Sequence, residues 1–310
     1  MIGMKPWELL GCIVAMVTPF LPNDSETLDE EGLRKLINYL IADQQVSGIV
    51  PCGTTGEAPT LTHEEHLDVI RITVEEVNGR VPVIAGAGSN STREAIELTK
   101  AAASAGADAT LQVGPYYNKP NQVGIIKHFE KIANATDLPI ILYNIPGRTG
   151  KNIEPETIVK LSKEFPTIVA LKDASGDLNQ TMKVIEGTLA SRFHVYSGDD
   201  SLTLPILSIG GHGVISVAGL IMGKEIQNMI DLALNFQYGT AMEIHYDLLK
   251  LMNALFVEPN PAPIKQALNW MGLPAGPVRL PLVDISPMSQ ELLRNELVRL
   301  NKIEEFVQPS

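Results

Sequence analysis

The chain has few cysteines, few aromatic residues and little positive charge. Cys12 and Cys52 are the only cysteines in 310 residues, which excludes a disulfide framework and leaves too few thiols for a cysteine metal cluster. Lysine and arginine number 24 against 36 aspartate and glutamate, and the net charge of -12 repels nucleic-acid phosphates and anionic membranes. We therefore predict no nucleic-acid partner and, from the cysteine usage, a cytoplasmic location.

Long apolar runs are also missing. No stretch approaches the roughly 20 consecutive apolar residues of a membrane-spanning helix, so we predict no membrane association. The run 9–17 resembles a signal-peptide core, but Glu8 precedes it and no small-residue cleavage site follows, so we interpret it as a strand. With 45% hydrophobic residues, the chain has enough apolar material for a large globular core.

Eight short apolar or β-branched runs alternate with segments that have the spacing of amphipathic helices. Most runs are apolar at successive positions, which indicates strands buried on both faces, as in a parallel sheet. Eight such units favour an α/β fold closed into a (β/α)8 TIM barrel, with an open doubly wound sheet as the alternative. The predicted strands are Cys12–Val17, Gly48–Cys52, Val81–Ala85, Ala109–Val113, Pro139–Tyr143, Thr167–Leu171, His194–Ser197 and Gly213–Ser216.

After Ser216 the pattern becomes wholly helical. We predict a catalytic barrel over residues 1–222 and a C-terminal helical region over residues 223–310. The predicted helices of this region are Ile226–Phe236, Met242–Phe256, Ile264–Met271 and Gln290–Phe306.

Lys172 follows the sixth predicted strand, at the end of the barrel where catalytic residues gather. Desolvation there disfavours the ammonium form, and a neutral lysine amine attacks a ketone to form an imine. A bound α-keto acid can then lose a proton to give an enamine without a metal or an organic cofactor. We therefore predict no cofactor and no metal. For this lysine taken alone, a solvated side chain at a strand end is the alternative.

Other polar side chains follow neighbouring strands. The phenol of Tyr143 can donate and accept protons, and the loop with Thr54 and Thr55 can cradle a carboxylate. Arg148 suits bidentate capture of a second carboxylate. Each feature taken singly has a structural alternative: Tyr143 as a buried tyrosine with a satisfied hydroxyl, the threonine loop as a turn, and Arg148 as a solvated arginine. Their convergence at one end of the barrel favours a site.

Three further motifs bear on possible interfaces, cofactors and metals. Tyr116 and Tyr117, if extended, point to opposite sides, one toward the mouth and the other toward an interface. Ser91 stands where a dinucleotide motif needs its third glycine. His63 and His66 lack the zinc-protease spacing and are interpreted as surface helix residues or part of an effector pocket.

As a set, these segments resemble the dihydrodipicolinate synthase and N-acetylneuraminate lyase family of class I aldolases over nearly the whole chain. Lyases that act on sialic acid typically carry Ser-Thr in place of Thr54-Thr55 and lack Arg148, which favours the synthase branch. The segments that carry the resemblance are 11–19, 53–57, 115–118, 143–150, 171–175, 197–200, 210–216 and 256–261.

The resemblance implies that Lys172 forms a Schiff base with pyruvate, while Thr54 and Thr55 hold the carboxylate of pyruvate beside Gly198 and Ile215. The enamine then attacks L-aspartate-4-semialdehyde. This condensation leads to 4-hydroxy-tetrahydrodipicolinate, on the route to diaminopimelate and lysine.

The resemblance also implies a proton relay of Tyr143, Thr55 and Tyr117, with Tyr117 contributed by a neighbouring subunit. A homotetramer built as a dimer of dimers follows from this. Arg148 receives the carboxylate of the semialdehyde at the entrance.

Family members inhibited by lysine resemble this chain around a pocket at a dimer interface, although Pro59 departs from the pattern there. The residues implied in lysine binding are His63, His66, Asn90, Glu94 and Tyr116. Two alternative functions remain at this point: a related pyruvate-dependent class I aldolase acting on a sugar-derived acid, and a non-catalytic homologue that binds a keto acid or lysine.

Overall fold

The computed structural model describes residues 10–23 and 26–304. Eight parallel strands form one sheet in the order β2-β1-β8-β7-β6-β5-β4-β3, and a parallel bridge between Ile49 and Val83 joins β2 to the segment before β3. The predicted TIM barrel is confirmed, and the doubly wound alternative is wrong. The strands are β1 (Gly11–Ala15), β2 (Gly48–Val50), β3 (Ile84–Gly86), β4 (Ala109–Val113), β5 (Ile140–Asn144), β6 (Ile168–Asp173), β7 (His194–Ser197) and β8 (Gly213–Ser216).

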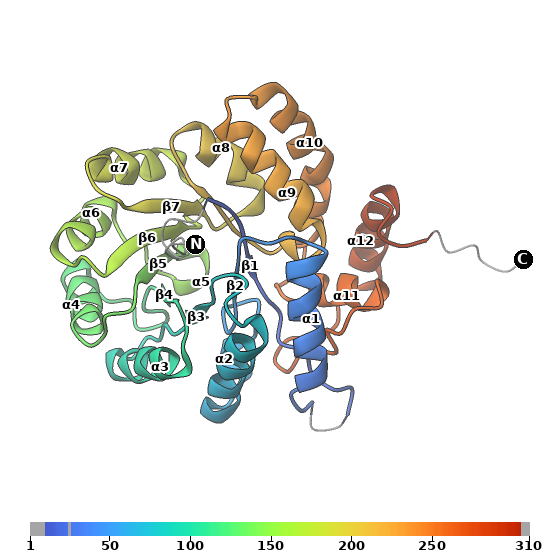
Figure 1. Ribbon diagram of the computed structural model, residues 1–310, viewed down its shortest axis with the longest axis horizontal. Coiled ribbons are helices and arrows are strands. Elements are labelled where there is room, and N and C mark those ends of the chain that lie inside the picture. Colours follow the sequence, from blue (N-terminus) through green and yellow to red (C-terminus); the bar gives the residue numbers. More distant parts are fainter. Residues whose placement is uncertain (1–9, 24–25, 305–310) are drawn as a thin grey trace, which may run out of the picture.

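Helices surround the barrel (Figure 1). A short helix, α5, begins at Pro146 and precedes the main helix between β5 and β6. The helices from β1 to β8 are α1 (Glu30–Ala42), η2 (Ala58–Thr60), α2 (His63–Val77), α3 (Thr92–Ala105), α4 (Gln122–Ala133), α5 (Pro146–Thr149), α6 (Pro155–Glu164), α7 (Leu178–Thr188), η3 (Asp200–Leu202) and α8 (Thr203–Ser208). Among the described residues, no helix has both the length and the apolar character needed to cross a membrane.

Alternate positions of each strand face the inside of the barrel. The interior layer includes Ile141 and Ala170, and the residues two positions further along these strands are Tyr143 and Lys172. The register pairs Tyr143 with Lys172 directly. Strand alternation therefore places the phenol and the amine side by side at the carboxyl end of the barrel interior.

The C-terminal region consists of α9 (Gly219–Leu234), α10 (Tyr238–Ala254), α11 (Ala262–Trp270) and α12 (Pro287–Arg299). Figure 1 shows these helices gathered on one side of the barrel, from α8 round to α1. Helix α9 crosses the predicted domain boundary at 222/223, and Met222 has a non-helical backbone (φ -129°, ψ 30°). The predicted helix Gln290–Phe306 extends too far, because α12 ends at Arg299. Asn301 has a left-handed backbone (φ 55°), which is incompatible with continuing the helix. Phe306 lies outside the described residues.

Two cations of the C-terminal region lie over one aromatic ring of the barrel. The Lys265 amine is 4.2 Å and the Arg279 guanidinium carbon 4.0 Å from the ring centroid of Phe20, in the loop after β1. Cations over an aromatic face are attracted by its negative quadrupole, the more so where water is excluded. The C-terminal region is therefore packed onto the carboxyl-end loops of the barrel, where the site lies.

Candidate active site

Lys172 lies inside the barrel near the end of β6, and 5% of the residue is exposed. Its amine is 4.3 Å from the ring centroid of Tyr143. Burial lowers the pKa of Lys172 to about 8; the carboxylate of Asp200 partly opposes this shift, and Arg148 adds to it. The expectation of a desolvated amine is confirmed, because a lysine with this pKa has a neutral fraction near physiological pH.

Asp200 is a buried carboxylate that the sequence did not single out for the site. It accepts the backbone N–H groups of Val217 (3.0 Å) and Ala218 (2.9 Å) and the hydroxyl of Ser216. Burial raises the pKa of Asp200, and these three hydrogen bonds oppose the rise. Asp200 therefore ties the loop after β7 to the end of β8 and places a carboxyl group close enough to affect Lys172.

Tyr143 is buried and hydrogen-bonded to Thr54. Burial raises the pKa of Tyr143 to about 12, while the charge of Arg148 and the bond with Thr54 oppose the rise. The phenol therefore keeps its proton at neutral pH and is able to donate it. The relay predicted from the sequence placed Thr55 beside Tyr143, and the structure places Thr54 there.

Thr55 has a different partner. Its residue is 2% exposed, and its Oγ1 accepts a hydrogen bond from Nδ2 of Asn260 at 2.9 Å. The same loop is fixed from the other side, because the hydroxyl of Thr18 donates to the carbonyl of Gly56 at 2.7 Å. Consecutive side chains point in different directions, so the two threonines contact different neighbours.

Gly198 follows β7 directly beside Lys172. Its N–H donates to the carbonyl of Asp173 at 2.7 Å. A Cβ at this position would lie 2.8 Å from Cβ of Ala174 and 3.1 Å from Cγ of Lys172, so a side chain has no room. Ile215 on β8 is buried and belongs to the interior layer of the barrel.

Arg148 lies on the short helix α5 rather than in the predicted loop, and its side chain is exposed at the mouth. Its Nη2 is 3.5 Å from the backbone carbonyl oxygen of Asn260. Together with Thr54 and Tyr143, it lines a cavity of about 410 Å³. Asn260 reaches this mouth from the C-terminal region, and in the sequence only its place in the segment 256–261 marks it.

Tyr117 has a left-handed backbone (φ 69°), so the extended conformation assumed from the sequence is wrong. Its N–H donates to the carbonyl of Thr149 at 3.3 Å, and 89% of the residue is exposed. Tyr116 lines the cavity, and Tyr117 is not among the residues that line it. The single chain therefore does not bring Tyr117 to Tyr143.

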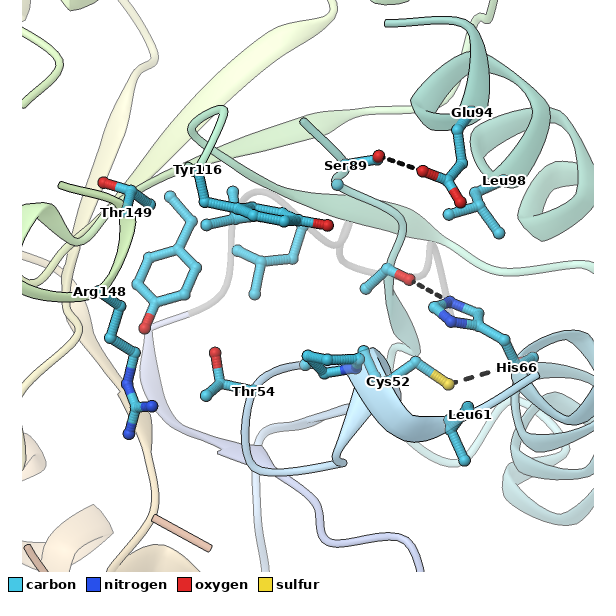
Figure 2. A pocket seen from close by; sticks show the side chains of 18 of the residues that line it. Cys52, Thr54, Leu61, His66, Ser89, Glu94, Leu98, Tyr116, Arg148 and Thr149 are labelled. Atoms are coloured by element: carbon cyan, nitrogen blue, oxygen red, sulfur yellow. Dashed lines mark hydrogen bonds between the residues drawn. The ribbon is translucent and has the colours of Figure 1, made fainter. Parts of the chain in front are cut away.

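Three of the five residues implied in lysine binding, His63, His66 and Glu94, line the far end of the same cavity. Figure 2 labels His66 and Glu94 there. Exposed His63 lies 3.2 Å from the carboxylate of Glu94, which also accepts a hydrogen bond from Ser89. His66 is buried, its Nε2 is 2.8 Å from the carbonyl oxygen of Gly86, and burial lowers its pKa. Asn90 donates to the carbonyl of Tyr116 at 3.1 Å without lining the cavity.

Figure 2 shows Thr54 and Arg148 toward one end of this cavity and His66, Ser89 and Glu94 toward the other, with Tyr116 between them. One continuous hollow thus connects the two groups of residues. The described part of the chain has no cluster of three or more histidine, cysteine, aspartate or glutamate side chains that could hold a metal ion.

A (β/α)8 barrel with a buried, partly neutral lysine beside a protonated phenol defines an enzyme of the class I aldolase type. The chain belongs to the dihydrodipicolinate synthetase family, whose sequence pattern matches residues 8–300. It is 50% identical over 293 residues to the 4-hydroxy-tetrahydrodipicolinate synthase of Methanocaldococcus jannaschii, covering 94% of this chain and 99% of that relative.

Two solved structures add ligands to this comparison. The dihydrodipicolinate synthase of Cyanidioschyzon merolae with lysine bound has a TM-score of 0.91 and 47% identity, covering 95% of this chain and 99% of that one. The chloride-inhibited enzyme of Acinetobacter baumannii, complexed with pyruvate, has a TM-score of 0.91 and 44% identity, covering 95% and 100%. The family resemblance read from the sequence is therefore confirmed.

Proposed function

We propose that this chain condenses pyruvate with L-aspartate-4-semialdehyde to give 4-hydroxy-tetrahydrodipicolinate, in the biosynthesis of diaminopimelate and lysine. The observation that carries the proposal is the buried amine of Lys172, with a pKa of about 8, next to the phenol of Tyr143. The names of the relatives support this reaction over the sugar-acid aldolase and the non-catalytic homologue.

The neutral amine of Lys172 attacks the keto carbon of pyruvate and forms a carbinolamine. Tyr143 donates a proton to the departing hydroxyl, which leaves as water and gives the imine. Loss of a proton from the methyl group converts the imine into an enamine, whose carbon attacks the aldehyde of the second substrate. The amine of the semialdehyde then displaces Lys172 by transimination, which closes the ring and frees the enzyme.

The two carboxylates are held at different places. Thr54 and Thr55 bind the carboxylate of pyruvate, with Gly198 and Ile215 forming the wall beside Lys172. Arg148 binds the carboxylate of the semialdehyde at the entrance, where its guanidinium is exposed. The guanidinium of Arg148 thus balances the charge of the semialdehyde, whereas the carboxylate of pyruvate is bound by neutral hydroxyl groups.

The proton relay requires a second chain. We propose that Tyr143, Thr54 and a partner's tyrosine equivalent to Tyr117 form it, with Thr55 of the sequence-based relay replaced by Thr54. The exposed ring of Tyr117 supports its use in a neighbouring subunit. This relay needs at least a dimer, and we propose a homotetramer made of two dimers, as the family resemblance implies.

We also propose feedback inhibition by lysine, bound by His63, His66, Asn90, Glu94 and Tyr116. The carboxylate of Glu94 suits the amino groups of lysine, and the lysine-bound relative supports the assignment.

Two free, buried cysteines support a cytoplasmic location. The division into a barrel over residues 1–222 and a helical region over residues 223–310 remains a proposal, with the boundary at the irregular backbone of Met222.

Borohydride reduction in the presence of pyruvate tests the reaction. We expect a reduced pyruvate adduct on Lys172 by mass spectrometry, none in Lys172→Ala, and the wild-type adduct in the exposed-lysine control Lys163→Ala. Turnover with L-aspartate-4-semialdehyde, but not with sugar-derived aldehydes, separates the proposed enzyme from the related aldolase. An absent adduct in the wild type would favour the non-catalytic homologue.

A further inference from the structure

Asn260 lies in the link between α10 and α11, and 4% of the residue is exposed. Through Asn260 the C-terminal region contacts the mouth of the barrel. Its side-chain amide is half satisfied: Nδ2 has a hydrogen-bond partner, whereas the buried Oδ1 has none among the described residues.

One residue touches both parts of the site that bind carboxylates in the proposed function. The side-chain Nδ2 of Asn260 donates to Oγ1 of Thr55 at 2.9 Å, across 205 positions of sequence. The backbone carbonyl oxygen of Asn260 lies 3.5 Å from Nη2 of Arg148. The two substrates would therefore be bound by groups that share a neighbour.

The contact with Thr55 fixes the direction in which its hydroxyl donates. An amide nitrogen only donates, so the oxygen of Thr55 accepts from it and keeps its own proton for another acceptor. Among residues 10–23 and 26–304, no acceptor is hydrogen-bonded to that proton. A carboxylate oxygen of the keto acid is an acceptor of the right charge for it.

The loop that carries Thr55 is held a second time by the same region. The carboxylate of Glu57 lies 2.5 Å from the amine of Lys265 on α11, and both side chains are at most 2% exposed. Glu57 also accepts the backbone N–H of Arg279 at 2.9 Å. Because the loop and α11 are tied together here, Asn260 meets Thr55 in a fixed geometry.

We propose that Asn260 is a positioning residue of this enzyme: its side-chain amide directs the hydroxyl of Thr55 toward the carboxylate of the keto acid, and its carbonyl holds the guanidinium of Arg148 at the entrance. The proposal rests on the proposed function. In this proposal Asn260 acts through Thr55 and Arg148 and is not a catalytic residue.

The test compares Asn260→Asp and Asn260→Ala with Asn253→Asp, an exposed residue of α10. Aspartate has the same shape but turns the donor into an acceptor, which reverses the hydroxyl of Thr55 and adds a negative charge. We expect KM for pyruvate to rise about 10-fold or more in Asn260→Asp and about threefold to 10-fold in Asn260→Ala. The control should keep both KM values of the wild type.

A double-variant experiment separates positioning from a general structural effect. In a Thr55→Val background, Asn260→Ala should raise KM for pyruvate no further, because the hydroxyl that it positions is gone. Additive effects of the two substitutions would overturn the inference. If Asn260→Asp fails to fold, Asn260→Ser takes its place. Serine keeps a short donor, so its KM for pyruvate should lie between those of the wild type and Asn260→Ala.

The outcomes distinguish the two levels of the proposal. A wild type that forms no reducible adduct with pyruvate would overturn the proposed function. A wild type that forms the adduct, with unchanged KM values in the Asn260 variants, would overturn the role of Asn260 alone.

Discussion

The amine of Lys172 and the ring of Tyr143 are paired across neighbouring strands, 4.3 Å from nitrogen to ring centroid. Burial acts on both groups in opposite senses: it lowers the pKa of Lys172 to about 8 and raises that of Tyr143 to about 12. At pH 7 about a tenth of the lysine is neutral while the phenol is protonated. One environment thus prepares a nucleophile and an acid together.

Imine formation should follow the titration of Lys172. The amine reacts only when neutral, so the rate of adduct formation with saturating pyruvate should rise with pH up to about 8 and level off above it. Rapid-quench borohydride trapping from about pH 6 to about pH 9.5 measures this rate. A rate that still rises steeply at about pH 9.5, as for an ordinary lysine, would contradict a buried amine.

The same shift has a consequence for stability. The folded pKa of Lys172 is about 8 and its ordinary value is 10.5, so the unfolded state binds more protons between these values. The free energy of unfolding contributed by this group should therefore rise with pH across that window and be lowest below pH 8. In urea unfolding, the free energy of unfolding of Lys172→Met should depend less on pH than that of the wild type. An identical pH dependence in both proteins would refute the lowered pKa of Lys172.

Gly198→Ala should impair catalysis through crowding of Lys172. The added methyl would meet Cγ of Lys172 at 3.1 Å and Cβ of Ala174 at 2.8 Å, which displaces the amine. We expect a fall in kcat of about 100-fold, since a misplaced reacting group commonly has an effect of this size. Gly239→Ala, where nothing lies within 4 Å, is the matched control and should keep the wild-type kcat. Equal rates in both variants would refute the steric argument.

Glu94→Gln should weaken inhibition by lysine. The substitution removes the carboxylate that faces the cavity but keeps its shape, and we expect the inhibitory concentration of lysine to rise about 10-fold or more, with the uninhibited rate retained. The control is Glu97→Gln on the exposed face of the same helix. Unchanged inhibition in Glu94→Gln would place the effector elsewhere.

Removing one partner of the buried ion pair between Glu57 and Lys265 should strongly lower the free energy of unfolding. Lys265→Met leaves the carboxylate of Glu57 buried without its cation, and we expect a loss of about 3 to 5 kcal/mol in the free energy of unfolding. Adding Glu57→Gln should recover part of this loss. Lys35→Met, which breaks an exposed pair with Glu31, should leave the free energy of unfolding nearly unchanged. Similar losses in the two single lysine variants would contradict the burial argument.

Local patterns carried most of the fold and part of the site. The strands are marked by runs of neighbouring apolar residues, so the sequence predicts them. The position of Lys172 follows from strand alternation in a barrel. The partner of Tyr143 does not, because which of two consecutive threonines faces the phenol depends on the loop backbone.

Long-range contacts were beyond the sequence. Asn260 meets Thr55 over a separation of 205 residues, and no periodicity links those positions. Likewise, Tyr117 has a left-handed backbone and donates its N–H to the carbonyl of Thr149 on α5, a contact that the neighbouring residues of Tyr117 do not indicate. Such contacts arise only when the chain closes on itself.

The ring of Phe20, covered by Lys265 and Arg279, bears on how this scaffold can be re-engineered. A barrel without helices α9 to α12 would lose both cations. The buried carboxylate of Glu57, in the loop that carries Thr54 and Thr55, would then have no cation partner. Grafting the eight-stranded cylinder into a chimera therefore requires carrying α11 and the segment through Arg279 along with it. To change substrate preference, substitutions on α5 disturb the fold less than substitutions at the contacts of Lys265 and Arg279 with the barrel.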